Sequence, residues 1–173
     1  MDLSVNPEIA KKNVEAKGEE HITLVFALDN EDFGVDVKAI REIVRVPPFI
    51  TRVPNAPEYI RGVINLRGNI FPVFDMQMKV GMNHRDLTDE ARIVVISWNE
   101  IQFGILVDSV REVCTIYDSQ IEQAGQISSS MDKKYLLGVA KHNDGRLIVL
   151  LDLPVLFDIE EILEEAKTAV AGS

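Results

Sequence analysis

The chain has 173 residues, enough for one domain or two small ones, and 46% of them are apolar, as in an ordinary globular protein. Its net charge of −10 argues against nucleic acids and anionic membranes as partners, because both attract basic surfaces. There is no apolar run long enough to span a membrane, no signal-peptide core, and only one cysteine, so we expect a soluble cytoplasmic protein without disulfides.

The first predicted element is a β-hairpin. Residues 1–20 are polar and mixed in charge, which favours a flexible N-terminal segment. Residues 22–28 form an apolar run, residues 29–32 supply a polar turn, and apolar side chains alternate over residues 33–37. This combination of a run, a turn and alternation is typical of two antiparallel strands.

A second hairpin is predicted further along the chain. Residues 38–46 fit either a helical turn or a strand, and the proline pair at 47–48 ends both. Residues 59–66 and 69–76 are rich in β-forming side chains. They flank the pair Arg67-Gly68, where we expect the turn.

The same pattern returns in the second half of the chain. Phe33-Gly34 recurs as Phe103-Gly104, an offset of 103 − 33 = 70 residues, and Tyr59 recurs as Tyr135, an offset of 135 − 59 = 76. This period is too long for a solenoid unit, so it indicates a duplicated small domain with repeat motifs over 26–76 and 96–153. Each repeat therefore serves as a control for the other.

The second repeat predicts hairpins at the matching places. Their turns are expected near residues 98–101 and at Asn143-Asp144-Gly145, and residues 117–134 are predicted to form a loop. Asp158 is a candidate N-cap for a helix that runs to about residue 169, within a C-terminal segment of residues 158–173. Short strands without helical spacers predict an all-β fold of two small barrels in residues 21–160.

Catalytic and metal motifs are missing from the sequence. The histidines are His21, His84 and His142, and neither an HExxH nor a CxxC spacing is present, so no metal site or cofactor is predicted. Cys114 stands where the first repeat has Val44, which favours a packing residue over a nucleophile. The sequence therefore predicts a protein that is not an enzyme.

Arg67 is the sharpest candidate for a binding residue. The second repeat carries Asn143-Asp144 in the corresponding turn, so the turn closes without an arginine. A guanidinium fork suits a carboxylate or a carbonyl of a partner, and the alternative is a solubilising charge. By contrast, Arg41-Glu42 recurs as Arg111-Glu112, which favours a structural role for Glu42, such as a salt bridge.

Glycines recur at the hairpins of both repeats. Gly62, Gly68 and Gly138 are expected to permit tight turns and close strand approach, and exposed glycine backbone also lets a partner barrel dock closely. Leu137 stands where the first repeat has Arg61. An exposed Leu137 indicates an interaction patch, and a buried one indicates core.

Three segments together carry a family resemblance. They are the Phe33-Gly34 segment with the following Arg41-Glu42, the run Arg52-Val53-Pro54-Asn55-Ala56-Pro57, and residues 59–75, which read YIRGVINLRGNIFPVFD. This combination resembles CheW, the coupling protein of bacterial chemotaxis, over about residues 20–160. The resemblance implies two five-stranded SH3-like β-barrels around a shared hydrophobic core.

The resemblance also implies partners and contact residues. Proteins of this family join the tips of methyl-accepting chemoreceptors to the histidine kinase CheA, whose regulatory domain is homologous to them. The implied receptor-binding residues are Arg67, Ile40, Glu42, Val110 and Val113. The implied kinase-binding residues are Gly62, Gly68, Gly138 and Leu137.

Two alternatives stay open at this point. A coupling protein of a related chemosensory pathway that controls something other than motility has the same adaptor chemistry. A small-molecule-binding β-barrel, from a different functional class, requires an enclosed apolar cavity with a few polar groups.

Overall fold

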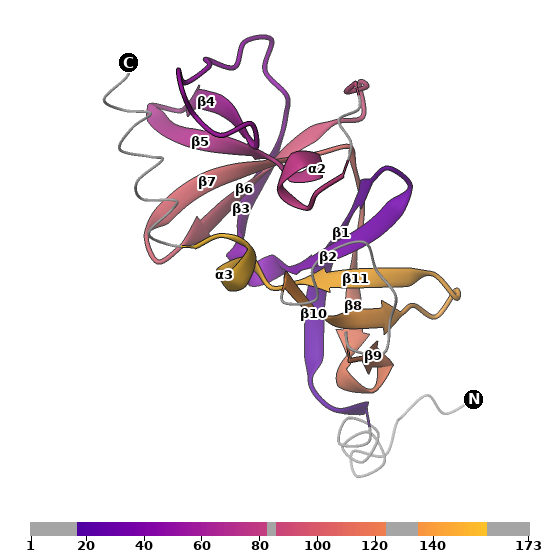
Figure 1. Ribbon diagram of the computed structural model, residues 1–173. Coiled ribbons are helices and arrows are strands. Elements are labelled where there is room, and N and C mark those ends of the chain that lie inside the picture. Colours follow the sequence, from indigo (N-terminus) through magenta and orange to yellow (C-terminus); the bar gives the residue numbers. More distant parts are fainter. Residues whose placement is uncertain (1–16, 83–85, 124–134, 159–173) are drawn as a thin grey trace, which may run out of the picture.

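Strands dominate the part of the chain that the computed structural model describes, residues 17–82, 86–123 and 135–158 (Figure 1). The first repeat supplies β1 (Glu20–Leu28), β2 (Glu31–Asp36), β3 (Ile40–Arg45), β4 (Ile60–Leu66) and β5 (Asn69–Asp75). The second repeat supplies β6 (Arg92–Trp98), β7 (Ile101–Val107), β8 (Ser109–Tyr117), β9 (Ile121–Glu122), β10 (Leu136–Lys141) and β11 (Leu147–Leu151). Between them lie short helical elements, η1 (Val37–Ala39), α2 (Met76–Lys79), η2 (Asp118–Gln120) and α3 (Leu153–Leu156).

The predicted hairpin turns are confirmed. β1 and β2 are joined by Asp29-Asn30, β4 and β5 by Arg67-Gly68, and β6 and β7 by Asn99-Glu100. Both residues of each pair have positive φ, which is the backbone conformation of a two-residue type I′ turn. Residues 38–46, for which a helical turn or a strand was expected, begin with η1 and continue as β3.

The strands form two sheets that each combine both repeats. One sheet has the order β8-β1-β2-β11-β10-β9, and the other has the order β3-β6-β7-β5-β4. The hairpin β1–β2 of the first repeat therefore lies between β8 and β11 of the second, and β6–β7 lies between β3 and β5 of the first (Figure 1). Each repeat thus contributes one hairpin to a sheet whose other strands come from the other repeat, and we call β1–β2 and β6–β7 the exchanged hairpins. β2 pairs in parallel with β11, and β7 pairs in parallel with β5.

One hydrophobic core connects the two sheets. It contains Leu24 and Phe26 of the six-stranded sheet together with Phe74, Val94 and Phe103 of the five-stranded sheet. Phe74 packs edge-on against Phe103, with ring centroids 5.6 Å apart, and both rings contact Phe157. The expected all-β class with two strand sets and a shared core is therefore confirmed, and β9 is the strand beyond the five expected in each set.

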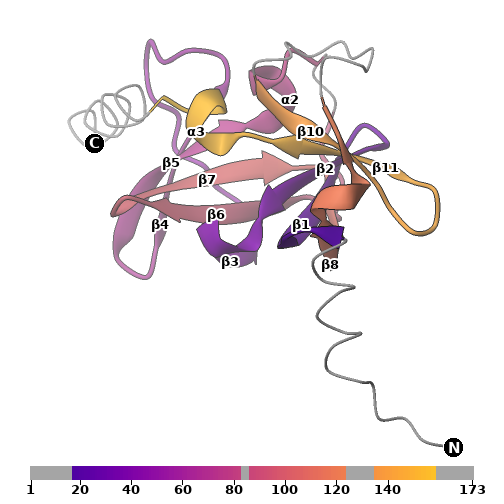
Figure 2. The same cartoon turned by 90° about the horizontal axis from the view of Figure 1, so that it is seen from below.

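The two repeats end in matching short helices. Asp75 is the N-cap of α2 and Asp152 is the N-cap of α3, and both helices lie along one side of the strands (Figure 2). The described chain thus has a short helix, α3, close to its C-terminal end. The helix predicted from Asp158 to residue 169 lies outside the described residues, as do most of residues 1–20 and 117–134. No helix in the described ranges is long and apolar enough to cross a membrane.

Candidate partner-binding surfaces

Arg67 and Glu42, both predicted receptor contacts, lie against each other. The Arg67-Gly68 turn is held by a hydrogen bond of 3.1 Å from the Gly68 backbone N–H to Oδ1 of Asn65. It places Nη1 of Arg67 2.5 Å from Oε2 of Glu42 on β3. The Arg67 side chain is 74% exposed and that of Glu42 is 21% exposed. The pair therefore presents a largely free guanidinium above an anchored carboxylate.

The second repeat contains an equivalent ion pair. Glu112 on β8, the counterpart of Glu42, is hydrogen-bonded by Nη2 of Arg146, which directly follows the turn glycine Gly145. The second repeat therefore also has an arginine beside this turn, although Asn143-Asp144 occupy the positions compared with Arg67. Arg67 precedes its turn glycine, whereas Arg146 follows its own. A position-by-position comparison of the repeats therefore does not align the two arginines, although each forms an ion pair with the equivalent glutamate. The structural role expected for Glu42, such as a salt bridge, is supported by its ion pair with Arg67.

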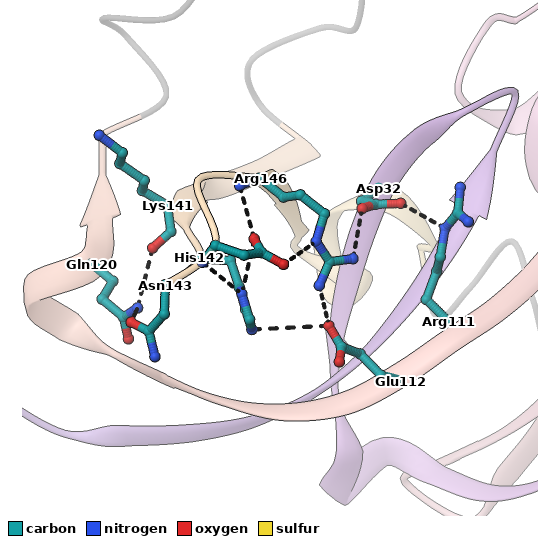
Figure 3. Close-up of polar contacts among 9 residues, drawn as sticks. Asp32, Arg111, Glu112, Gln120, Lys141, His142, Asn143 and Arg146 are labelled. Atoms are coloured by element: carbon teal, nitrogen blue, oxygen red, sulfur yellow. Dashed lines mark hydrogen bonds and ion pairs between the residues drawn. The ribbon is translucent and has the colours of Figure 1, made fainter.

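The two ion pairs differ in how many carboxylates surround the arginine, and Figure 3 shows those around Arg146. Arg146 also donates from Nε to Asp144 at 2.7 Å and from Nη1 to Asp32 at 3.3 Å, and its side chain is only 37% exposed. Its hydrogen bond to Glu112, followed by that to Asp144, raises the pKa of the Arg146 guanidinium. The Arg146 backbone N–H and guanidinium lower the pKa of Asp144 to about 2. Arg146 is thus committed to internal contacts, whereas Arg67 is presented to solvent.

The apolar receptor-contact candidates fall into two groups. Ile40 and Val110 are half-buried and pack against the shared core, so they support the surface from below. Val113 on β8 is exposed. Its counterpart in the first repeat, Ile43 on β3, is exposed as well and was missed in the sequence, although the Ile43/Val113 match at the 70-residue offset was the available signal.

Gly62 and Gly138 are explained by contacts inside the fold. A Cβ on Gly62 would lie 2.3 Å from the carbonyl oxygen of Thr51, and one on Gly138 would lie 2.6 Å from that of Glu122. A Cβ on Gly68 would meet no atom within 4 Å, so Gly68 serves the positive φ of the turn. Contact of these glycines with a kinase stays a prediction.

Leu137 is exposed, which is the outcome that indicates an interaction patch. Its side chain is 57% exposed and lies beside a mostly apolar hollow of about 300 Å³. Residues of both sheets line this hollow, among them Ile96 and Trp98 of β6 and Leu153 and Pro154 of α3. Trp98 was not predicted to take part in binding, because the sequence places it at the turn expected near residues 98–101.

Cys114 packs as predicted. It is half-buried against a small cluster of Val25, Ile116, Ala140, Ile148 and Leu150. Burial, followed by the nearby Glu112 carboxylate, raises the pKa of its thiol. A neutral, partly covered thiol is a poor nucleophile.

Comparison with known proteins assigns the family. The family model described as CheW-like domain matches residues 23–161. The chain belongs to the CheW-like family. The chemotaxis protein CheW of Rhizobium meliloti is 34% identical over 152 residues, which cover 88% of this chain and 96% of that protein. The CheW of Thermotoga maritima is 35% identical over 146 residues, with 84% and 89% covered.

A solved structure supports the same assignment. The crystal structure of the scaffolding protein TtCheW from Thermoanaerobacter tengcongensis superimposes with a TM-score of 0.72 at 32% identity. The match covers 83% of this chain and 96% of that one. The exchanged two-sheet architecture is therefore that of a CheW scaffold.

Proposed function

We propose that this protein is a non-catalytic adaptor that couples methyl-accepting chemoreceptors to the histidine kinase CheA. The observation that carries this proposal is the Arg67–Glu42 pair, which presents an exposed guanidinium on a CheW-like chain. The guanidinium has five N–H donors, and within the described residues its hydrogen bond to Glu42 comes from Nη1. Its remaining donors suit carboxylates and carbonyls on a receptor helix.

The proposed receptor surface consists of Arg67, Glu42, Ile43 and Val113, supported from below by Ile40 and Val110. Ile43 and Val113 are exposed apolar side chains on β3 and β8, which are end strands of the two sheets in the described residues. An apolar contact beside a fixed charge pair is typical of protein interfaces, where aromatic or aliphatic anchors supply burial and an arginine supplies specificity.

The proposed kinase surface is centred on Leu137. Its exposed side chain can insert into a second CheW-like barrel, and the adjoining apolar hollow can accept an apolar side chain from that barrel. Gly68 contributes through its turn, while Gly62 and Gly138 act indirectly, because they let the strands beside them approach closely.

Binding to purified CheA regulatory domain tests this proposal. Leu137→Glu is compared with Leu147→Glu, which changes an equally exposed leucine on β11. We expect Leu137→Glu to weaken kinase binding by about tenfold or more, which is the loss of one interface anchor. Leu147→Glu should bind as the wild type does. Failure of the wild-type protein to bind at tens of micromolar would overturn the adaptor function itself.

We place the adaptor in the cytoplasm, recruited to membrane-associated receptor arrays. A related chemosensory pathway with another output would use the same surfaces, and the identity of the receptors that bind separates the two. The small-molecule alternative is less well supported, because aromatic rings fill the shared core and the apolar hollow beside the exposed Leu137 is open to solvent instead of enclosed.

A further inference from the structure

Three metal-ligating side chains meet on the six-stranded sheet. Glu112, Cys114 and His142 each place one donor atom within 4.8 Å of the other two, and all three are half-buried. Glu112 and Cys114 are two residues apart on β8, so their side chains share one face of the strand. His142 follows β10 and reaches the same face from the β10–β11 turn (Figure 3).

The orientation of His142 is fixed by its surroundings. Its backbone N–H donates to the carbonyl of Arg146 at 2.8 Å, and its own carbonyl accepts from the Gly145 N–H at 2.9 Å. The ring nitrogen Nδ1 lies 3.1 Å from a carboxylate oxygen of Asp144, and Nε2 lies 3.9 Å from Oε1 of Glu112. A carboxylate on one ring nitrogen with other donors in front of the second is the arrangement found around metal-binding histidines.

The charged side chains around these donors have a negative net charge, which favours binding of a divalent cation. Asp32, Glu112 and Asp144 oppose Arg111 and Arg146, which gives 2 − 3 = −1. Coordination of a metal ion by Cys114 releases the thiol proton, and the bound thiolate then adds a second negative charge. Arg146 is hydrogen-bonded to Oε1 of Glu112 and so orients this carboxylate, whose Oε2 accepts no hydrogen bond from the described residues.

We propose that Glu112, Cys114 and His142 form a zinc site with a water molecule as the fourth ligand. Sulfur, imidazole and carboxylate donors together suit Zn²⁺, whereas Mg²⁺ and Ca²⁺ select oxygen donors. Zinc–ligand distances of about 2.0–2.3 Å place tetrahedral ligands roughly 3.3–3.7 Å apart, so small side-chain rotations close the present separations. The bound ion clamps the β10–β11 turn to β8.

Neither repeat carries a sequence motif for this site. The donors are separated by 142 − 114 = 28 residues and meet only because β8, β1, β2, β11 and β10 lie side by side in one curved sheet. The first repeat has Val44 at the position of Cys114, so the zinc site belongs to the second repeat alone.

Cobalt substitution of the metal-free full-length protein tests the site. Because Cys114 is the single cysteine of the chain, a thiolate-to-Co²⁺ charge-transfer band reports this residue directly. We expect one equivalent of Co²⁺ to produce this band together with the intense visible bands of tetrahedral cobalt, and Zn²⁺ to abolish both by displacement. Cys114→Val, which copies the first repeat, and His142→Asn should remove the charge-transfer band. Asp144→Asn should weaken Zn²⁺ affinity by about tenfold to a hundredfold, as loss of a supporting carboxylate does.

His21→Asn is the matched control. His21 belongs to a separate group with Glu19 and Asp118 that contains no sulfur, so its loss should leave the thiolate-to-Co²⁺ charge-transfer band unchanged. The site is refuted when the wild type shows no thiolate band at one equivalent, when the band survives in His142→Asn, or when His21→Asn removes it. Protection of the wild-type thiol from alkylation by Zn²⁺ gives the same answer without a variant, and unchanged alkylation also refutes the site.

Discussion

Charge reversal at Arg67 separates its role in binding from its role in the fold. The Arg67–Glu42 pair is mostly exposed on the arginine side, and exposed ion pairs contribute about 0.2–1 kcal/mol to stability. In Arg67→Glu two carboxylates face each other, which adds repulsion of about 1 kcal/mol at 4 Å in water. The total cost is therefore at most about 2 kcal/mol, a decrease of roughly 4–8 °C in Tm for a domain of this size.

Arg67→Glu should weaken receptor binding by more than its loss of folding stability can explain. An arginine at the centre of an interface commonly contributes about 2 kcal/mol or more, which corresponds to roughly thirtyfold in affinity. Anisotropy titration with a labelled receptor cytoplasmic fragment should show this loss in Arg67→Glu, while circular dichroism stays that of the wild type. Lys141→Glu, an exposed lysine on the other sheet, makes the same change in net charge and should bind normally.

The double variant Glu42→Arg with Arg67→Glu distinguishes loss of the ion pair from loss of direct receptor recognition by Arg67. It restores opposite charges across the same two positions, so Tm should return close to that of the wild type. Receptor affinity should stay low, because the guanidinium then projects from β3 instead of from the turn. Recovery of affinity in the double variant, or normal affinity in Arg67→Glu, would refute direct recognition of Arg67.

Three further predictions follow from contacts within the fold. Gly62→Ala should lower Tm more than Gly68→Ala, since both residues have positive φ but only Gly62 places the new Cβ 2.3 Å from a backbone oxygen; equal shifts would contradict this. The His21 ring, 2.6 Å away, lowers the pKa of Asp118 below 3.8, so the stability that Asp118 adds is present above that pH and is lost as the pH falls through the lowered pKa. The difference in urea midpoint between the wild type and Asp118→Asn should therefore shrink at low pH, and a constant difference would count against it. Fragments 1–82 and 86–173 should each lack native β-structure by circular dichroism and regain it when mixed, because each sheet needs strands of both; an independently folded fragment would contradict the exchange.

Local features of the fold were predictable, and contacts between distant residues were less so. Asn30, Gly68 and Gly145 mark turns because their positive φ is a local property of the residue type. The repeat gave the number of hairpins. It gave no information on whether a hairpin pairs within its own repeat or with the other, since both arrangements bury the same apolar faces.

The candidate sites show the same division. Arg67 was found because one turn was compared with the other, yet its partner Glu42 lies 25 residues away and Arg146 occupies a different position in its turn. Leu137 was found as an unmatched residue, but the hollow beside it depends on Trp98, which a distant strand supplies. The sequence therefore identified single binding residues where the two repeats differ at matching positions. It did not identify the distant residues that contact them.

The exchange of hairpins gives the two proposed surfaces a physical connection. β3 carries Glu42 and Ile43 of the receptor surface and pairs with β6, where Ile40 stands opposite Ile96. Ile96 and Trp98 of β6 form one wall of the hollow that contains Leu137 of the kinase surface. Ala39, directly before β3, lines the same hollow, so a displacement of β3 moves part of its lining. If each repeat formed its own sheet, β6 would pair within the second repeat, and the two surfaces would meet only through the loops between them.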